Sequence, residues 1–485
     1  MTPRARVDPA DLDAVRKAVG LDMPGSTLRP IGLREIVIAP NALDQLDGIV
    51  AAQRSNGGLA MVVDNRPMRR GGDDLKPLVE ERLRGLDAEA QVIRLGRDGA
   101  ELHADRAAIG EVIAAGSGAG CLVAVGSGTV CDIAKEASRE LNVPYVVVQT
   151  ANSVNAFSDD MAVLLIHGVK RTVPSRWPDG LIIDLTTIAD APAALNQAGV
   201  GELAAMFTAP ADWRLAAAAG MDGTWDRRVV GLFLDGAAEL ASAAPSATAH
   251  DMTAQRTLVE LMTLSGLALG IAGRTSPISG TEHTVSHLLD MMAARADRPT
   301  GLHGAQVGVA ALAVSVAWRN VLGEVDPERL TATEPPTAAT MRQRIDEAFR
   351  ELDPSRAMAD ECWSQYSLKL DRWQARGSDR GQMAADWAHI ERDLRELVGD
   401  PFHVASILRS AGAPVTFEEL DPPVSRERAA WALFNGHLIR ERFTLADLAM
   451  FSDAWTYDRA LAAIEEAEDV AGAAPRRPLA VDGRG

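Results

Sequence analysis

Cys121-Leu122-Val123-Ala124-Val125-Gly126-Ser127-Gly128-Thr129 is the stretch of this sequence that decides the fold. An unbroken apolar run ends in a turn with two glycines, and a helical pattern begins directly after the turn. Continuous apolar runs are typical of strands that are buried on both faces of a parallel sheet. Small residues at such a turn let the backbone approach a pyrophosphate at the N-terminus of the helix. A lone Gly-x-Gly also occurs where the turn only needs tight packing, so both interpretations stand at this point.

The same pattern repeats on both sides of this stretch. Short runs rich in β-branched residues alternate with helical segments, of which 74–86 and 105–115 are clear examples. Such alternation predicts a parallel sheet with helices on its faces. The predicted strands are 35–38, 60–63, 91–94, 121–125, 145–148 and 181–183, and two more are predicted to flank a turn at 168–171.

The strand signals stop after residue 190, where long helical patterns take over. We therefore predict an α/β protein in which a Rossmann-like parallel-sheet domain (1–190) precedes an all-helical metal-binding domain (191–465). The remaining residues, 466–485, are rich in Gly, Pro and Arg towards the end and are predicted to be a disordered tail. The main predicted helices after the sheet domain are 191–219, 226–243, 250–273, 281–295, 304–322 and 338–351.

Composition excludes several classes of partner. A net charge of -18 argues against nucleic acid or an anionic membrane surface. The first residues lack the apolar core of a signal peptide, and no run of 18 apolar residues is present. The three cysteines, Cys121, Cys131 and Cys362, form no Cys-x-x-Cys pair, which fits a reducing compartment. We expect a cytoplasmic protein with no membrane partner and no nucleic-acid partner.

Three of the nine histidines fall within 21 positions: His283, His287 and His303. His283 and His287 are four residues apart on a predicted helix, so they share a face. Two imidazoles and an upstream carboxylate form the ligand set of a catalytic divalent metal that keeps a position open for substrate. Glu202 is the candidate carboxylate because the glycines beside it allow a close approach. A glutamate in the first turn also simply stabilises a helix, and any single histidine is more often a surface or core residue.

Asp64 follows the predicted strand 60–63 and is the candidate for binding the adenosine ribose. An acid at this point accepts hydrogen bonds from the ribose hydroxyls and repels a 2′-phosphate, which favours NAD over NADP. The neighbouring Arg66, Arg69 and Arg70 could still accommodate that phosphate, and a solvated turn explains the acid equally well. The sequence therefore leaves NAD and NADP both open.

Residues 125–135 resemble the nucleotide turn of the sn-glycerol-1-phosphate dehydrogenase family, within the iron-containing alcohol dehydrogenase and dehydroquinate-synthase-like superfamily. Further segments resemble it in the same order: 149–157, 168–172, 201–213, 279–287 with 303–308, and 439–448. Ordered blocks of this kind are specific at the level of the superfamily. The resemblance implies an NAD(P)-binding domain, a helical domain that holds a divalent metal, and a substrate bound between them.

The resemblance also implies roles for individual residues. Glu202, His283 and His303 match the metal positions, and Lys170 is a candidate for the substrate phosphate, although a solvated turn explains it as well. Asn155 matches a position that contacts the substrate. The residues that match or adjoin the cofactor contacts are Asp64, Gly126, Ser127, Gly128, Thr129, Thr150, Ser153 and Asp159.

Four positions depart from the family pattern. The family's metal aspartate is Glu202 here, which is one methylene longer and resembles the cyclases of the superfamily. Asn155 replaces an acid, Asp159 stands where a small serine is usual, and Met206 stands where a lysine is common. These departures leave the identity of the substrate open, and they leave open whether activity is retained.

The function that these features predict is an NAD(P)- and metal-dependent dehydrogenase that interconverts a small ketone phosphate and a polyol phosphate. Zinc, nickel or iron(II) would suit the ligands. His287 is the candidate catalytic residue, as a proton relay or a phosphate contact, although a packing histidine is the alternative. A sugar-phosphate cyclase and a non-catalytic relative are the competing hypotheses. The sequence also leaves open whether the chain forms a homo-oligomer.

Overall fold

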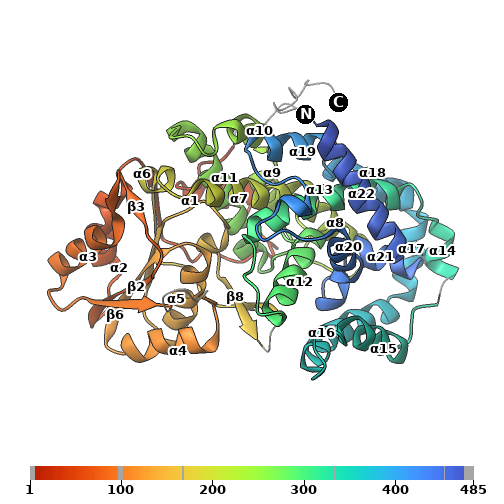
Figure 1. Ribbon diagram of the computed structural model, residues 1–485, viewed down its shortest axis with the longest axis horizontal. Helices are drawn as coiled ribbons and strands as arrows, with labels where there is room; N and C mark the ends of the chain where they lie inside the picture. Colours follow the sequence, from red (N-terminus) through yellow and green to blue (C-terminus); the bar gives the residue numbers. More distant parts are fainter. Residues whose placement is uncertain (1–5, 97–101, 167–168, 333, 453, 475–485) are drawn as a thin grey trace. The chain divides into compact units, whose positions relative to one another are not determined.

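The computed structural model describes residues 6–96, 102–166, 169–332, 334–452 and 454–474 (Figure 1). The chain divides into two compact units. The first comprises Met1–Ile166, Lys170–Val200 and Arg228–Thr275, and the second comprises His167–Val169, Gly201–Arg227 and Ser276–Gly485.

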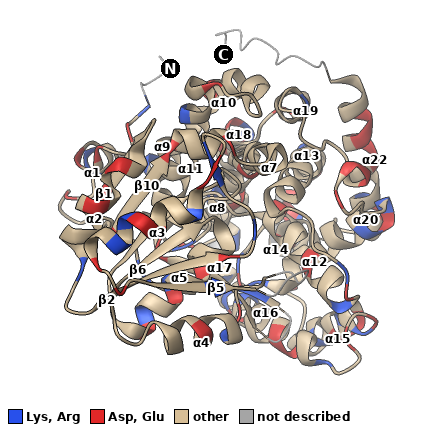
Figure 2. Ribbon diagram, turned by 60° about the vertical axis from the view of Figure 1, so that its left-hand side comes forward, with Lys and Arg blue, Asp and Glu red and all other residues tan. Residues whose placement is uncertain are grey.

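The first unit is built on a six-stranded sheet in the order β1-β10-β7-β6-β2-β5, and every neighbouring pair of strands is parallel. All six strands predicted from the sequence are present, which confirms the expected α/β fold. In Figure 2 these strands are drawn almost entirely in tan, while most charged residues lie on helices. The strands are β1 (Glu35–Ala39), β2 (Gly58–Asp64), β5 (Gln91–Leu95), β6 (Ala119–Gly126), β7 (Tyr145–Gln149) and β10 (Gly180–Asp184).

Helices cover both faces of this sheet. Leu59, Met61 and Val63 alternate along β2 and point to one face, where they share a core cluster with apolar residues of α2 (Leu46–Gln53) and α3 (Leu75–Leu86). On the other face, α4 (Arg106–Ala115) and α5 (Gly128–Leu141) pack against each other and against the sheet (Figure 1). Burial on two faces explains why the four inner strands, β10, β7, β6 and β2, are apolar runs without alternation.

Two short hairpins accompany the sheet. They are β3 (Arg69–Arg70) with β4 (Asp73–Asp74), and β8 (Met161–Ile166) with β9 (Val169–Pro174). The second hairpin confirms the two extra strands predicted around 168–171, although Lys170 lies inside β9 and not in the turn. Residues 167–168 of that predicted turn lie outside the described residues.

Residues 228–275 cluster with the sheet unit, whereas the sequence assigned them to the helical domain. The main helix of this segment, α11 (Met252–Ala272), contacts β1 and α6 (Leu185–Ala189). It is buried over most of its length from Ala254 to Ile271, so other elements must pack against it on every side. A helical pattern in the sequence does not reveal which elements those are. For this reason the predicted boundary at residue 190 differs from the observed division. The other helical elements of this unit are α1 (Leu12–Val19), η1 (Ala42–Gln45), η2 (Ala156–Ser158), α9 (Arg227–Leu234), α10 (Ala237–Ala243) and η4 (Ala244–Ser246).

The second unit is helical over the residues that the structure describes. Its centre is α13 (His303–Leu322), which packs against α12 (Thr281–Arg295), α19 (Pro401–Ser410) and α22 (Tyr457–Ala473). By length and composition α13 could cross a membrane, but 83% of its most apolar stretch is buried inside the protein, as expected of a core helix. The helix α7 (Ala193–Ala204) leads from the first unit into the second.

The remaining elements surround this centre. The elements are η3 (Ala205–Phe207), α8 (Ala209–Ala218), α14 (Pro327–Ala332), α15 (Ala338–Phe349), α16 (Ala357–Ala375), α17 (Gly377–Ala385), α18 (Trp387–Leu397), η5 (Phe417–Glu419), α20 (Arg426–Asn435), η6 (Gly436–Ile439) and α21 (Leu445–Phe451).

The predicted tail at 466–485 begins too early. Helix α22 continues to Ala473 because Ala467, Val470 and Ala471 extend its buried face. The small alanine and glycine side chains in this stretch made its apolar stripe hard to recognise in the sequence. Residues 475–485 lie outside the described residues.

Candidate active site

Three adjacent strands bring the predicted cofactor residues to one edge of the sheet. Asp64 is the last residue of β2, Gly126 is the last of β6, and Thr150 follows the last residue of β7. The register pairs Gly126 with Gln149, and the Thr150 amide donates to the Gly126 carbonyl at 3.2 Å. Because the strands are parallel and neighbouring, these carboxyl ends lie side by side. That edge is where open α/β sheets bind nucleotides.

Helix α5 begins at the same edge with its first amides available. It starts at Gly128, and the side chain of its N-cap residue, Ser127, makes no capping hydrogen bond. Ser127 and Gly128 are partly exposed and Thr129 is exposed, and Ser153 donates from its hydroxyl to the Ser127 hydroxyl at 3.5 Å. A helix N-terminus of this kind favours a phosphate group. The residues present therefore fit a dinucleotide.

The two glycines of the turn also have a packing role. A Cβ on Gly126 would lie 2.6 Å from the Val130 Cβ, and one on Gly128 would lie 2.8 Å from the Val154 Cγ2. Both distances are shorter than real Cβ contacts. The packing interpretation of this Gly-x-Gly therefore holds beside the nucleotide interpretation, since the same small residues serve both.

Asp159 has a partner that the sequence did not suggest. It forms an ion pair with Lys135, and the Lys135 ammonium also donates to the carbonyls of Ala156 and Met161. Both charged side chains are buried. Asp159 therefore anchors the third turn of α5 to the segment after β7, and a direct contact with the cofactor stays a prediction.

The two substrate candidates lie in the first unit. Asn155 is buried and donates from its amide to the hydroxyl of Ser265 at 3.2 Å. Lys170 is half-buried on β9. Neither arrangement tests a contact with substrate, so both assignments stay predictions.

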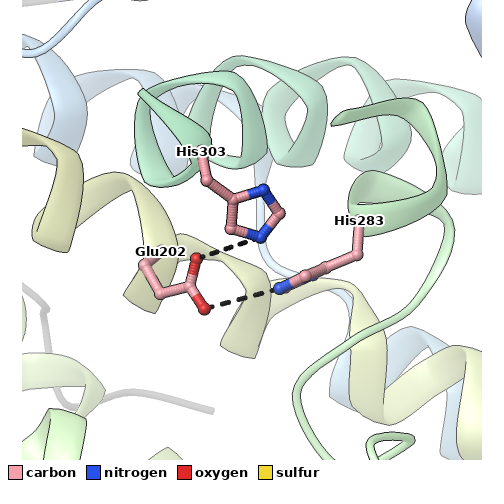
Figure 3. Close-up of side chains that lie close together, drawn as sticks. All are labelled: Glu202, His283 and His303. Carbon is pink, nitrogen blue, oxygen red and sulfur yellow. Dashed lines mark ion pairs between the residues drawn. The ribbon is translucent and has the colours of Figure 1, made fainter. Parts of the chain in front are cut away.

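The predicted metal ligands converge within the second unit (Figure 3). Glu202 comes from α7, His283 from α12, and His303 is the first residue of α13. The Nε2 atom of His283 lies 3.5 Å from Glu202 Oε1, and the Nε2 atom of His303 lies 3.8 Å from Glu202 Oε2. One ligand atom from each residue lies within 4.8 Å of the others. The Glu202 side chain is 3% exposed and the His303 side chain is 23% exposed, so solvent reaches the group beside His303.

These atoms fit a divalent cation. Glu202 Oε2 is buried and has no hydrogen-bond partner among the described residues, which is costly unless a positive group satisfies it. The separations of 3.5 and 3.8 Å exceed the usual N–H···O hydrogen bond of about 3.2 Å or less. Zinc binds nitrogen and oxygen at about 2.0–2.2 Å, so two ligand atoms of one ion stand somewhat farther apart than hydrogen-bonded atoms.

Glycines bring α7 close enough to α13 for this convergence. A Cβ on Gly201 would lie 2.2 Å from the Gly304 carbonyl oxygen, and one on Gly308 would lie 2.7 Å from the Gly201 Cα. The two backbones are thus in contact beside Glu202 and His303. The sequence suggested that the glycine before Glu202 makes room for a ligand. It makes room for a helix instead, and that contact positions the ligand residues.

Glu282 holds the His283 ring at Nδ1, while Nε2 lies on the side of Glu202. The Glu282 carboxylate lies 2.9 Å from His283 Nδ1 and also accepts from the Gly280 amide and the Thr208 hydroxyl. Because a carboxylate only accepts, Nδ1 carries the hydrogen and Nε2 faces Glu202. The sequence did not identify Glu282 as a partner of His283. Adjacent residues on a helix point in different directions, so contact between their side chains is not expected from the pattern.

The electrostatics of this group favour a cation. Burial alone lowers the pKa of His283, but the carboxylates of Glu202 and Glu282 outweigh it and raise the pKa to about 9. Burial alone raises the pKa of Glu202, but the neighbouring imidazoles of His283 and His303 lower it overall. Without a metal, a proton on His283 supplies the positive charge, and a bound metal would displace that proton.

We expect Glu282→Gln to weaken metal binding by about 10–100-fold, because an amide offers one acceptor where the carboxylate serves three donors. The measurement is the zinc dissociation constant by chelator competition. Glu347→Gln is the matched control, since Glu347 is an exposed glutamate whose carboxylate accepts from Gln343. An affinity equal to that of the control would contradict the anchoring role.

His287 lies beside the candidate metal ligands. Its ring stacks on His303 with centroids 5.4 Å apart, and Arg440 Nη2 lies 2.9 Å from His287 Nδ1. A guanidinium only donates, so His287 accepts at Nδ1 and carries its hydrogen on Nε2. The sequence did not pair Arg440 with this histidine, although 439–448 was one of the segments that carry the resemblance. Met206, where the family has lysine, is fully buried and brings no charge.

Comparison with known proteins agrees with this architecture. Residues 37–192 match the family model described as "Iron-containing alcohol dehydrogenase". The fold also resembles a probable glycerol dehydrogenase from Sinorhizobium meliloti, with a TM-score of 0.56 at 17% identity over 92% of this chain and 99% of the other. A glycerol dehydrogenase from Schizosaccharomyces pombe gives a TM-score of 0.55 at 15% identity over 94% and 95% of the two chains.

Residues 37–192 thus correspond to an iron-containing alcohol dehydrogenase domain, and the fold is that of these two structures. Glycerol-1-phosphate dehydrogenase [NAD(P)+] of Aeropyrum pernix is 30% identical over 60% of this chain and 80% of the relative. The enzyme of that name from Bacillus subtilis is 26% identical over 87% of this chain and 92% of the relative. The chain belongs to the glycerol-1-phosphate dehydrogenase family. The expected family is confirmed, and the cyclase and non-catalytic alternatives are not favoured.

Proposed function

We propose that this protein is an NAD(P)- and metal-dependent dehydrogenase that interconverts dihydroxyacetone phosphate and glycerol 1-phosphate. The proposal is supported by two relatives that bear the name of that enzyme. This chain matches both over most of their length. The observation that carries it is the buried, unpartnered oxygen of Glu202 facing two imidazole nitrogens.

Glu202, His283 and His303 would hold the metal, which when bound acts as a Lewis acid on a substrate oxygen. Glu282 orients His283 by accepting from Nδ1. His287 presents a hydrogen on Nε2, held there by the Arg440 guanidinium, and would donate it to a substrate oxygen. The partial exposure of His303 leaves that side of the group for substrate.

The first unit would bind the cofactor at the sheet edge. The N-terminal amides of α5 at Gly128 and Thr129 would bind the pyrophosphate. Asp64 would accept from the ribose hydroxyls, which favours NAD. Its carboxylate also lies 3.8 Å from the Lys76 ammonium, so it is fixed in place at the strand end.

The identity of the metal and the cellular location belong to the same proposal. One carboxylate and two imidazoles suit zinc, nickel or iron(II), and we propose zinc as the first to test. The three cysteines are free and buried, which supports a reducing cytoplasm. A homo-oligomer also stays a prediction.

The purified chain, loaded with zinc, nickel or iron(II) in turn, is expected to oxidise NADH with dihydroxyacetone phosphate as substrate. The reaction is followed by the absorbance of the nicotinamide. Parallel assays replace NADH with NADPH, or dihydroxyacetone phosphate with unphosphorylated dihydroxyacetone. We expect kcat/KM to be higher for NADH than for NADPH, and higher for the phosphorylated ketone. A lasting absorbance change excludes a cyclase, which returns NAD oxidised. No turnover with any ketone phosphate and any of the three metals would overturn the proposal.

A further inference from the structure

Ser286 connects the metal candidate His303 to two other buried residues. The Ser286 hydroxyl lies 2.8 Å from His303 Nδ1 and 2.7 Å from Gln306 Oε1. The Gln306 amide nitrogen lies 3.2 Å from Asp290 Oδ1. Ser286, Gln306 and Asp290 are all nine-tenths or more buried, and all come from α12 and α13. The chain of contacts thus runs from His303 into the interior of the second unit.

The chemistry of each group fixes the direction of these hydrogen bonds. A carboxylate only accepts, so Gln306 turns its NH₂ towards Asp290 and its carbonyl oxygen towards Ser286. A carbonyl oxygen also only accepts, so the single proton of the Ser286 hydroxyl is donated to Gln306. Towards His303 the hydroxyl can then only accept. His303 therefore carries its hydrogen on Nδ1, and its unprotonated Nε2 lies on the side of Glu202.

We propose that Asp290, Gln306 and Ser286 form a relay of positioning residues that fixes the tautomer of His303 for metal binding. The inference rests on the proposed function, because it assumes that His303 is a ligand. An imidazole binds metal through an unprotonated nitrogen, and the partner of its other nitrogen decides which nitrogen that is.

The relay differs from the anchor of the second imidazole. His283 is held by the full negative charge of Glu282, whereas His303 is held by a neutral hydroxyl. The charge that orients the hydroxyl belongs to Asp290, which acts through the Gln306 amide. The two ligand imidazoles are thus oriented by separate sets of residues, and a change in one set leaves the other in place.

The test compares S286A, which removes the acceptor, with S286T, which keeps a hydroxyl. The zinc dissociation constant of the purified full chain is measured by chelator competition. Loss of an outer hydrogen bond to a ligand typically costs 10–100-fold, so S286A is expected to bind zinc about 10–100-fold more weakly. S286T is expected to stay within about threefold of the unaltered chain, since an equal hydroxyl is retained. Melting of the metal-free variants shows whether each is folded.

A second measurement reads the tautomer directly. Two-bond ¹H–¹⁵N spectra of metal-free protein with labelled histidine are expected to show His303 protonated on Nδ1 in the unaltered chain, and on both nitrogens in exchange in S286A. A packing role alone would leave this spectrum unchanged. Unchanged zinc affinity in folded S286A, or equal loss in S286A and S286T, would overturn the relay.

Failure of the relay is distinguishable from failure of the proposed function. If the unaltered chain binds no zinc, nickel or iron(II), the metal site itself is refuted, and the relay with it. If it binds one equivalent that Glu202→Ala abolishes, the site stands. Unaltered binding in S286A then refutes the relay alone.

Discussion

Glu202→Ala is expected to remove the bound metal and to reduce dehydrogenase activity to background. Glu202 supplies the one negative charge among the three ligands, and its Oε2 atom has no other partner. Loss of an outer partner of a ligand already costs about 10–100-fold in affinity, so loss of the ligand itself should cost more than about 100-fold. The measurements are metal content by elemental analysis and kcat/KM for NADH with dihydroxyacetone phosphate.

Two further variants sharpen this experiment. His303→Ala should give the same loss, because it removes one of the two imidazole donors. Glu347→Ala, at an exposed position, should behave as the unaltered chain. The metal-free form of Glu202→Ala loses the buried ion pair between Glu202 and His283, so its melting is measured beside that of the unaltered protein to show that the variant is folded. Retained turnover in both Glu202→Ala and His303→Ala would refute the ligand assignment.

The sheet could be predicted from the sequence because its signal is local. The four inner strands, β10, β7, β6 and β2, are buried on both faces, so they appear as short apolar runs between helical patterns, as in 121–125 and 145–148. The predicted ranges differ from the observed strands by at most two residues at either end. The polar strand ends, such as Asp64 and Gln149, are the residues that the apolar pattern could not include.

The metal ligands could be proposed for a different reason. Two imidazoles one helical turn apart, with a third histidine nearby, are rare enough to suggest a cluster. Which of them are ligands depended on the resemblance to a family. Spacing alone would have favoured His283 with His287, whereas the structure groups His283 with His303 and Glu202.

The residues that hold the candidate ligands in place could not be predicted from local sequence patterns. Arg440 meets His287 across 153 positions of sequence, and Thr208 meets Glu282 across 74. Contacts of this kind follow from how α12 packs between its neighbours, and one sequence does not carry that information. Ser286 and Gln306 look like ordinary small and polar helix residues until α12 and α13 are brought together.

Gly201→Ala is expected to have the largest effect of any change that leaves the ligands themselves intact. The new methyl group would lie 2.2 Å from the Gly304 carbonyl oxygen, and a backbone atom cannot rotate away as a side chain can. Helices α7 and α13 would have to separate. Overpacking of this kind costs about 1–3 kcal/mol and more where backbone must move.

The same separation would pull Glu202 away from His303, because Gly201 adjoins the first and Gly304 adjoins the second. We therefore expect a lower melting temperature together with weaker zinc binding, and the two should change in the same variant.

Gly110→Ala is the matched control. Gly110 is also an interior helical glycine, but a Cβ there meets nothing within 4 Å. It should raise stability by about 0.5–1 kcal/mol through helix propensity and leave zinc affinity unchanged. Equal behaviour of Gly201→Ala and Gly110→Ala would show that the contact between α7 and α13 does not position the ligands.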